Sequence, residues 1–117
     1  MKKFHRNRLT IPTALLLFSI LFSISFACKK SDEKPGSNQV FMQNTAFNPS
    51  SITVSAHTTI TWTNKDGMKH TVSSDANLFE SGNLDNGGTF SHKFDSVGTF
   101  PYHCKLHSGM TAKVIVQ

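Results

Sequence analysis

Between residue 38 and the C-terminus, alternation of apolar and polar residues constrains the fold more than any other feature of this chain. Apolar residues recur at every second position, with threonine, serine, lysine or histidine between them. The clearest runs are residues 52–54, 60–62, 90–94, 100–104 and 112–116. A period of two predicts β-strands with one buried face. Helical periodicity is not apparent over any useful length of this region, so we expect an all-β domain.

Turn-forming residues separate these runs. They combine asparagine, glycine, proline and serine, and stand at positions 48–50, 64–67, 83–88, 96–98 and 108–109. Such residues favour chain reversal. Short strands at about 8–12-residue spacing are typical of an antiparallel sandwich or barrel. A domain of about 80 residues buries only about 60% of its unfolded surface, so a metal that binds only the folded state would add stability.

The first 27 residues have a different composition. Residues 1–8 hold four basic residues and no acidic residue, and residues 9–27 are mostly apolar. A basic head, an apolar middle and small residues before a boundary are typical of a secretory signal peptide. The alternative is an uncleaved anchor, since about 20 apolar residues can span a bilayer. Because Pro12 and several polar residues interrupt the run, we expect residues 1–27 to be a signal peptide that is removed.

Cys28 lies where the apolar segment ends. Ala27-Cys28 resembles the bacterial lipoprotein box, in which the cysteine is lipidated, although Ser25-Phe26-Ala27 also suits an ordinary signal peptidase. Residues 28–37 are charged and have the composition of a flexible tether. We therefore expect Cys28 to be a lipidation site, with the folded domain at residues 38–117. The protein would then be exported to the bacterial periplasm or cell envelope and held at a membrane.

The number of cysteines and the distribution of charge argue against a disulfide and against nucleic-acid binding. A disulfide between Cys28 and Cys104 would tie a strand end to the tether, so we do not expect one. Four of the 12 basic residues lie in the first eight positions, and from Cys28 onward eight lysines face seven acidic residues. The basic character of the whole chain therefore reflects export and gives no indication of nucleic-acid binding.

Three soft donors follow the strand at 100–104 with equal spacing: Cys104, His107 and Met110. A lone cysteine is usually a small buried hydrophobe, but a thiolate, an imidazole and a thioether together are three of the four ligands of a blue-copper site. The fourth ligand is a second histidine. His70 is the best candidate because it follows a turn and begins the apolar-alternating segment 70–72, predicted as a strand.

The other histidines fit this position less well. His5 lies in the predicted signal peptide, and His57 lies in a turn that we expect to face solvent. His92 is on the inward side of its run and is expected to be partly buried. His103 points to the opposite face of the strand from Cys104, because successive side chains alternate.

Three segments carry a family resemblance: Phe47-x-Pro49-x-x-Ile52-x-Val54, then Ile60-x-Trp62-x-Asn64-x-Asp66-x-x-x-His70-Thr71-Val72, then Gly98-x-Phe100-x-Tyr102-His103-Cys104-x-x-His107-x-x-Met110. This pattern resembles the plastocyanin/amicyanin branch of the cupredoxins over essentially all of residues 39–117. The resemblance implies a Greek-key β-sandwich of about 7–8 strands, one type 1 copper ion, and electron transfer by Cu(I)/Cu(II) cycling. The family's ligands correspond to His70, Cys104, His107 and Met110, and the short gap between the last two resembles amicyanin.

The same resemblance indicates which residues surround the ligands. We expect Thr71, Leu106 and Asn64 beside them, with the Thr71 N–H bonded to the Cys104 sulfur. Leu106 stands where many relatives have proline, so its N–H can also reach that sulfur. The ring edge of His107 is expected at the surface. The candidates for an apolar docking patch around it are Met68, Leu106, Gly109 and Phe79, and those for a basic rim are Lys65, Lys69 and Lys105, with Asp66 as the exception.

These features favour a monomeric electron carrier that docks briefly with protein redox partners. The alternative is a copper storage or delivery protein that hands Cu(I) to an oxidase. A structural zinc site is a third possibility, which the thioether disfavours. Four ligands leave no position for a substrate, and the sequence shows no carboxylate pair or Ser-His-Asp arrangement beside them, so we do not expect an enzyme.

Overall fold

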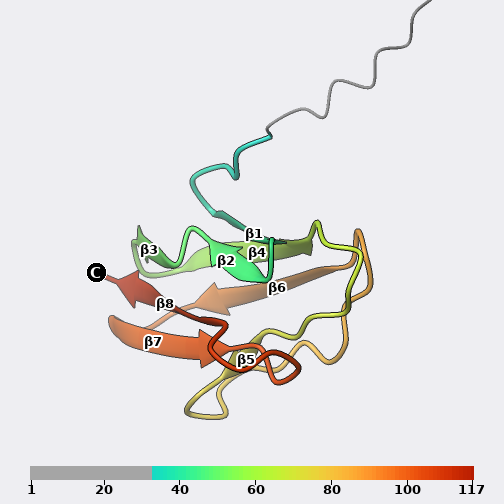
Figure 1. Ribbon diagram of the computed structural model, residues 1–117. Helices are drawn as coiled ribbons and strands as arrows, with labels where there is room; N and C mark the ends of the chain where they lie inside the picture. The colour runs from blue at the N-terminus through green and yellow to red at the C-terminus, as the bar shows by residue number, and fades with distance from the viewer. Residues whose placement is uncertain (1–32) are drawn as a thin grey trace, which may run out of the picture. The chain divides into compact units, whose positions relative to one another are not determined.

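The computed structural model describes residues 33–117. The predicted signal peptide, the predicted lipidation site Cys28 and the first half of the predicted tether lie outside the described residues. Within residues 33–117 the secondary structure consists of eight strands, and no helix long enough to cross a membrane is present there. The strands are β1 (Gln39–Gln43), β2 (Ala46–Asn48), β3 (Ser51–Val54), β4 (Thr58–Asn64), β5 (Ser73–Ser74), β6 (Thr89–Phe94), β7 (Gly98–His103) and β8 (Thr111–Val116) (Figure 1).

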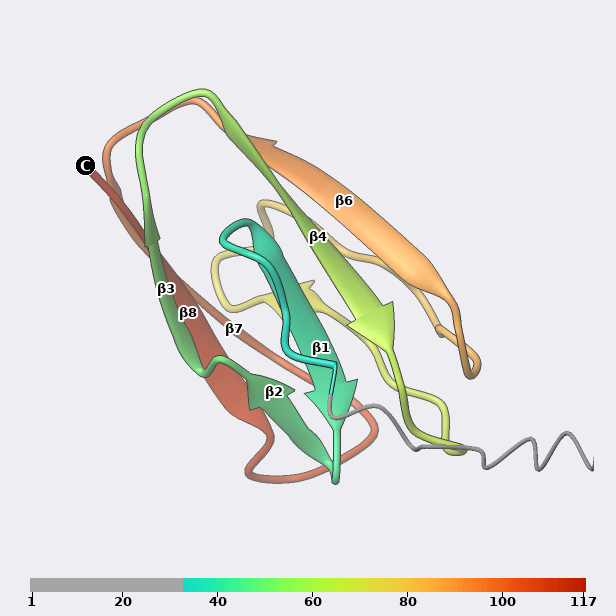
Figure 2. The same ribbon diagram turned by 90° about the horizontal axis from the view of Figure 1, so that it is seen from above.

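The strands form two four-stranded sheets, with the orders β2-β1-β4-β6 and β3-β8-β7-β5. Seen from above, β3, β8 and β7 make one layer and β1, β4 and β6 the other (Figure 2). This arrangement confirms the predicted all-β sandwich. Two strand pairs depart from the antiparallel arrangement expected from the strand spacing, because β1 runs parallel to β4 and β3 runs parallel to β8. The parallel pairs arise where the chain crosses between the sheets from β2 to β3.

The alternating runs form the inward faces of the strands. In β4 the side chains of Ile60, Trp62 and Asn64 are buried, and in β8 those of Val114 and Val116 are buried. The segment Val40-Phe41-Met42 in β1 does not alternate, since all three residues are buried. Phe41 is covered on its outer side by the Lys65 ammonium group, 4.6 Å from the ring centroid.

Trp62 is the centre of the core and has no exposed surface. Its ring meets Tyr102 edge-on at 5.5 Å between centroids and stacks with Phe79 at 5.9 Å. Phe79 is therefore a core residue, and its predicted place in a surface docking patch is wrong. Aromatic pairs at these distances contribute roughly 0.5–1.5 kcal/mol beyond the burial of their area.

The predicted strand at residues 70–72 is also absent. His70 makes an isolated bridge with Leu84 instead, and the neighbouring strand β5 begins at Ser73. The backbone at His70 donates to and accepts from Leu84, with N···O distances of 3.1 and 2.8 Å. These bonds replace those of a continuous strand and hold His70 in place.

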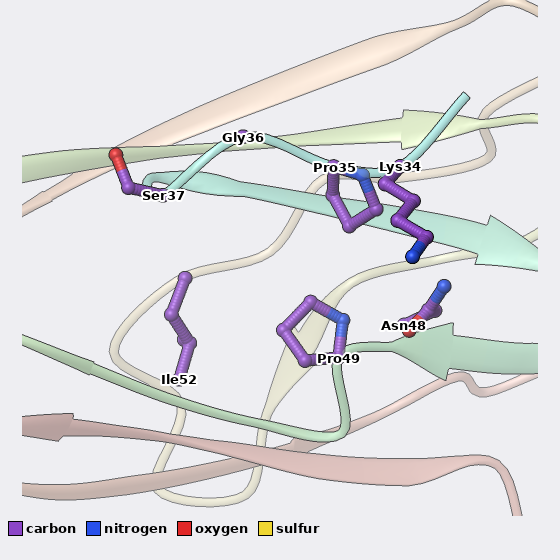
Figure 3. A pocket seen from close by; sticks show the side chains of 7 residues that line it. All are labelled: Lys34, Pro35, Gly36, Ser37, Asn48, Pro49 and Ile52. Atoms are coloured by element: carbon purple, nitrogen blue, oxygen red, sulfur yellow. The ribbon is translucent and has the colours of Figure 1, made fainter.

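Residues 34–37 run along the open edge between the two sheets. A groove of about 420 Å³ separates them from Asn48, Pro49 and Ile52, and Figure 3 shows the Pro35 and Pro49 rings on opposite sides of it. The Gln39 N–H donates to the Gly36 carbonyl oxygen at 3.1 Å, which closes the turn into β1. None of the predicted copper ligands lines this groove.

Candidate metal centre

Three donor atoms converge at one end of the sandwich. His70 Nδ1 and His107 Nδ1 are 3.1 Å apart, and Cys104 Sγ lies 3.8 Å from the first and 3.6 Å from the second. His70 and Cys104 are buried, while His107 is partly exposed. The structure therefore brings together three of the four ligands predicted from the sequence.

The loop between β7 and β8 supplies two of these donors. Cys104 directly follows β7, and Met110 directly precedes β8, so the antiparallel pairing of these strands brings the two residues close. The Cys104 N–H donates to the Met110 carbonyl at 3.0 Å, and the Met110 N–H donates to the His107 carbonyl at 3.2 Å. Gly109 has a φ of 83°, a left-handed conformation that favours glycine. Met110 is buried beside the other donors.

His70 comes from the segment between β4 and β5 and is held at its other ring nitrogen. Its Nε2 lies 2.7 Å from Asp66 Oδ2. An ionised carboxylate can only accept a hydrogen bond, so Nε2 carries the hydrogen. In the neutral ring the lone pair is then on Nδ1, the atom that faces Cys104 and His107. The sequence prediction treated Asp66 only as an acidic exception in a basic rim, although its position four residues before His70 is visible in the sequence.

Asp66 also binds the β1–β2 turn. Its Oδ1 accepts from the Asn44 N–H at 2.8 Å, and its Oδ2 accepts from the Thr45 N–H at 3.0 Å. Burial by itself would raise the pKa of Asp66, but the hydrogen bonds from Thr45, His70 and Asn44 outweigh it and hold that pKa below its ordinary value. The carboxylate is therefore ionised at neutral pH.

Thr71 connects the sulfur to the metal-binding loop. Its backbone N–H donates to Cys104 Sγ at 3.3 Å. Its hydroxyl oxygen accepts from the Lys105 N–H at 2.8 Å and lies 3.0 Å from the Ser73 hydroxyl. The second sulfur bond suggested by the sequence, from the Leu106 N–H, is not among the hydrogen bonds of residues 33–117.

Asn64 is fully buried and holds the turn that leads to His70. Its amide nitrogen donates to the carbonyl oxygens of Met68 and Leu84 at 2.8 and 2.9 Å. Its side-chain oxygen accepts from the Asp66 N–H at 2.8 Å. Asn64 therefore acts on the backbone around the site rather than on a donor atom.

Exposed residues suited to an apolar surface lie close in sequence to two of the predicted ligands, Met68 to His70, and Leu106 and Gly109 to His107. Met68 is 50% exposed and Leu106 is 47% exposed, and Gly109 also faces solvent. The three lysines expected as a basic rim each lie beside an acidic group: Lys65 beside Glu33 at 2.9 Å, Lys69 beside Asp85 at 3.8 Å, and Lys105 beside Glu80 at 2.8 Å. The charge of the rim is therefore largely balanced.

The remaining described histidines lie away from the three donors. His57 is exposed in its turn and its Nδ1 contacts Asp95 at 3.0 Å, and the His103 ring contacts Asp75. His92 is partly buried against the ring of Phe79. Within the described residues, the group of side chains able to hold a metal ion is His70, Cys104 and His107.

The spacing of these donors fits a single metal ion. A first-row divalent ion binds imidazole nitrogen at about 2.0 Å and thiolate sulfur at about 2.3 Å, so three such ligands around one ion in a plane are separated by about 3.5 Å between nitrogens and about 3.7 Å between nitrogen and sulfur. The observed separations of 3.1, 3.6 and 3.8 Å are close to these values.

Comparison with known proteins gives a consistent result. A family model described as a Cupredoxin-like domain matches residues 13–116. Amicyanin-alpha from Methylorubrum extorquens is 30% identical over 93% of this chain and 98% of that protein. Chloroplastic plastocyanin from Tetradesmus obliquus is 30% identical over 82% of this chain and 73% of that protein. The solved structure of a purple cupredoxin from Nitrosopumilus maritimus has a TM-score of 0.63 and 29% identity, and the match covers 68% of this chain and 98% of that one.

Cupredoxins of these kinds hold one type 1 copper ion and serve in electron transfer. A thiolate, two imidazoles and a nearby thioether are the donors that such a copper ion requires, and they are the side chains that lie near one another here. The sequence match over most of the chain, the two-sheet fold and the donor set agree, and the chain belongs to the cupredoxin-like family.

Proposed function

We propose that this protein is an exported electron carrier that passes single electrons between protein redox partners by Cu(I)/Cu(II) cycling at one type 1 site. The observation that carries the proposal is the convergence of Cys104 Sγ and the Nδ1 atoms of His70 and His107 within 4.8 Å of one another. Met110 would be the fourth residue to hold the ion, because it is buried at the end of the same loop.

The bound copper ion supplies a one-electron couple, and the chain's own residues determine how easily that couple operates. A thiolate and a thioether favour Cu(I), whereas imidazole accommodates both valence states. The backbone bonds of the 104–110 loop and the His70–Leu84 bridge hold the segments that carry the donors in position. A site that changes shape little between valence states exchanges electrons with little rearrangement.

The burial of the donors supports transfer rather than catalysis. His70, Cys104 and Met110 are covered by protein, and four ligands leave no position at which a substrate can bind. His107 is the one proposed ligand with an exposed edge. We therefore propose that electrons pass through His107 and that the protein is not an enzyme.

Partners would dock on the apolar surface next to this edge. Met68, Leu106 and Gly109 are exposed. We propose that a partner contacts these residues and also the neighbouring Lys69 and Lys105. Small apolar patches suit brief complexes. Lipidation at Cys28 would hold the protein at a bacterial membrane and confine its search for partners to that surface.

The visible spectrum of the copper-loaded protein tests this proposal. Cu(II) is added to the metal-free protein, and an intense blue thiolate-to-copper band is expected. Cys104→Ser should abolish the band, and Met68→Ala, a change of an exposed residue outside the donor set, should retain it. A colourless protein that binds Cu(I) alone would instead favour copper delivery. A site that binds zinc and forms no coloured copper complex would favour a structural role.

A further inference from the structure

We propose that Asp66 is a positioning residue that fixes the ring of His70 for metal binding and stabilises the oxidised state of the site. This inference rests on the proposed copper function and deepens it by assigning a role to a carboxylate outside the ligand set. The observation is the contact of 2.7 Å between Asp66 Oδ2 and His70 Nε2, in which the imidazole side chain is fully buried and the carboxylate side chain is 15% exposed.

The ring of His70 has two nitrogens, and the contact with Asp66 decides between them. Because the carboxylate accepts the Nε2 hydrogen, Nδ1 is left with its lone pair toward Cys104 and His107. A second tautomer would place a hydrogen where the metal must bind. Asp66 therefore selects the ligating tautomer and sets the plane of the ring.

The carboxylate is itself held by the β1–β2 turn. Asn44 and Thr45 have φ values of 55° and 57°, as the two central residues of a tight two-residue hairpin turn require. In this conformation both backbone N–H groups point to Asp66. The Asp66 carbonyl oxygen also accepts from the Asn86 side chain at 2.9 Å. Two backbone N–H groups thus hold the carboxylate that contacts His70, and Asn86 holds the backbone of the same residue.

The charge of Asp66 is directed at His70 rather than at a lysine. Within residues 33–117 the Asp66 carboxylate contacts the His70 ring, while the neighbouring Lys65 is paired with Glu33 and Lys69 with Asp85. A carboxylate bonded to a ligating imidazole raises the basicity of that ligand. The additional negative charge favours the more highly charged ion, Cu(II), over Cu(I). Removing the charge should therefore raise the reduction potential.

Asp66→Asn tests this role, because an amide oxygen can still accept from His70 Nε2 while the charge is lost. Asp85→Asn is the matched control, since it removes the same charge from an exposed residue whose contact is Lys69 and not a donor. For Asp66→Asn we expect Zn(II) to bind about 10–100-fold more weakly, as for other residues that support metal ligands. The reduction potential should rise by about 59 mV for each tenfold loss of Cu(II) affinity beyond that of Cu(I).

The control variant should change both quantities much less. Equal changes in the two variants would overturn the proposal, because they would show a general charge effect. A lower unfolding temperature of metal-free Asp66→Asn with unchanged Zn(II) affinity and potential would also overturn it, since Asp66 would then be merely structural. Zn(II) binding does not depend on redox activity, so this test remains decisive even if the electron-carrier proposal fails.

A measurement on the unaltered protein covers the case in which the variant does not fold. With Zn(II) bound, nitrogen-15 NMR should show hydrogen on His70 Nε2 and the metal on Nδ1. A hydrogen on Nδ1, or an Nε2–H that exchanges as freely as that of an exposed histidine, would contradict the proposed role.

Discussion

His92 shows how burial among aromatic rings alters a single ionisable side chain. Its ring centroid lies 4.7 Å from that of Phe79 and 4.8 Å from that of Phe94. Burial lowers the pKa of His92 below its ordinary value of 6.5, and the nearby charge of Asp95 only partly opposes this effect. The unfolded chain therefore binds a proton at this residue more readily than the folded protein does, so acid favours unfolding.

This difference predicts a pH-dependent stability. The stability associated with neutral His92 is fully present above about pH 6.5 and is lost as the pH falls from there through the lowered folded-state pKa. His92→Phe should therefore lose less of its free energy of unfolding between about pH 7.5 and pH 5 than the wild type does, as measured by urea unfolding of metal-free protein. Identical pH profiles for His92→Phe and the wild type would contradict the assignment.

Tyr102 gives a second test at the residue scale. Within the described residues, its hydroxyl oxygen and the Trp62 indole nitrogen are buried and form no hydrogen bond of good geometry. Burial raises the pKa of Tyr102 to about 12, and the nearby Trp62 indole N–H only partly opposes this effect. Because the hydroxyl is buried without a partner, Tyr102→Phe should leave the free energy of unfolding unchanged or raise it by up to about 1 kcal/mol. Tyr102→Leu, which also removes the ring contacts with Phe47 and Trp62, should lower it by about 2 kcal/mol. A loss above about 1 kcal/mol in Tyr102→Phe would show that the hydroxyl has a partner.

At the scale of elements, the segment between β4 and β5 and the loop between β7 and β8 are joined through Thr71. The Thr71 hydroxyl accepts the Lys105 N–H, and the Thr71 N–H donates to the Cys104 sulfur. Thr71 is buried, so water does not replace a lost partner. The two segments therefore hold their donors in place together.

Thr71→Val removes the acceptor for the Lys105 N–H and retains the shape of the side chain. The Lys105 N–H then loses its acceptor at a partly buried position, and the buried Ser73 hydroxyl loses its contact, so the free energy of unfolding should fall by about 1 kcal/mol. The Lys105 amide should also exchange its hydrogen faster. Thr53→Val, an equivalent change at an exposed position in β3, should have little effect. Equal stability of Thr71→Val and Thr53→Val would contradict the proposed connection.

Most of the strands could be predicted from the local alternation of apolar and polar residues. The parts of the fold that could not be predicted depend on contacts between residues that are distant in sequence. Alternation located the inward faces of β4 and β8, because one face of each is buried. The continuous apolar segment in β1 gave no alternating signal, and β2 and β5 contain three and two residues. His70 is held by Leu84, fourteen positions away, which no local periodicity predicts.

The candidate site was predictable to a similar extent. The spacing of Cys104, His107 and Met110 indicated a shared loop, because short loops bring their residues together. The bond between Asp66 and His70 depends on where the β1–β2 turn lies, and Phe79 is buried because the two sheets close over it. The four-residue spacing of Asp66 and His70 was visible in the sequence, but the packing that orients this carboxylate and buries Phe79 was not.

At the scale of the whole folded part that the structure describes, positive and negative charges are balanced. Residues 33–117 contain six lysines and six acidic residues. The lysines near the proposed docking surface are paired with Glu33, Glu80 and Asp85. Exposed pairs of this kind add only about 0–1 kcal/mol each to stability. Their main consequence is that the docking end presents little net charge to another protein.

This balance predicts how electron exchange depends on salt. The self-exchange rate between reduced and oxidised copies, measured by NMR line broadening, should change by less than about tenfold between low and high ionic strength, below the range of strong electrostatic steering. Two unpaired basic rims would repel each other, so the rate would rise steeply with salt. A double variant, Glu80→Gln with Asp85→Asn, frees Lys105 and Lys69 and should introduce that dependence. A steep rise in the wild type would contradict the balanced surface.

The central claim is that Cys104, His70, His107 and Met110 hold a copper ion that changes valence without leaving the protein. Reductive titration of the Cu(II)-loaded protein in the presence of a Cu(I) chelator measures this most directly. We predict that one electron per protein removes the blue band, that reoxidation restores it, and that the chelator takes up no copper through repeated cycles. Transfer of the copper to the chelator on reduction would contradict the account and identify a delivery protein instead.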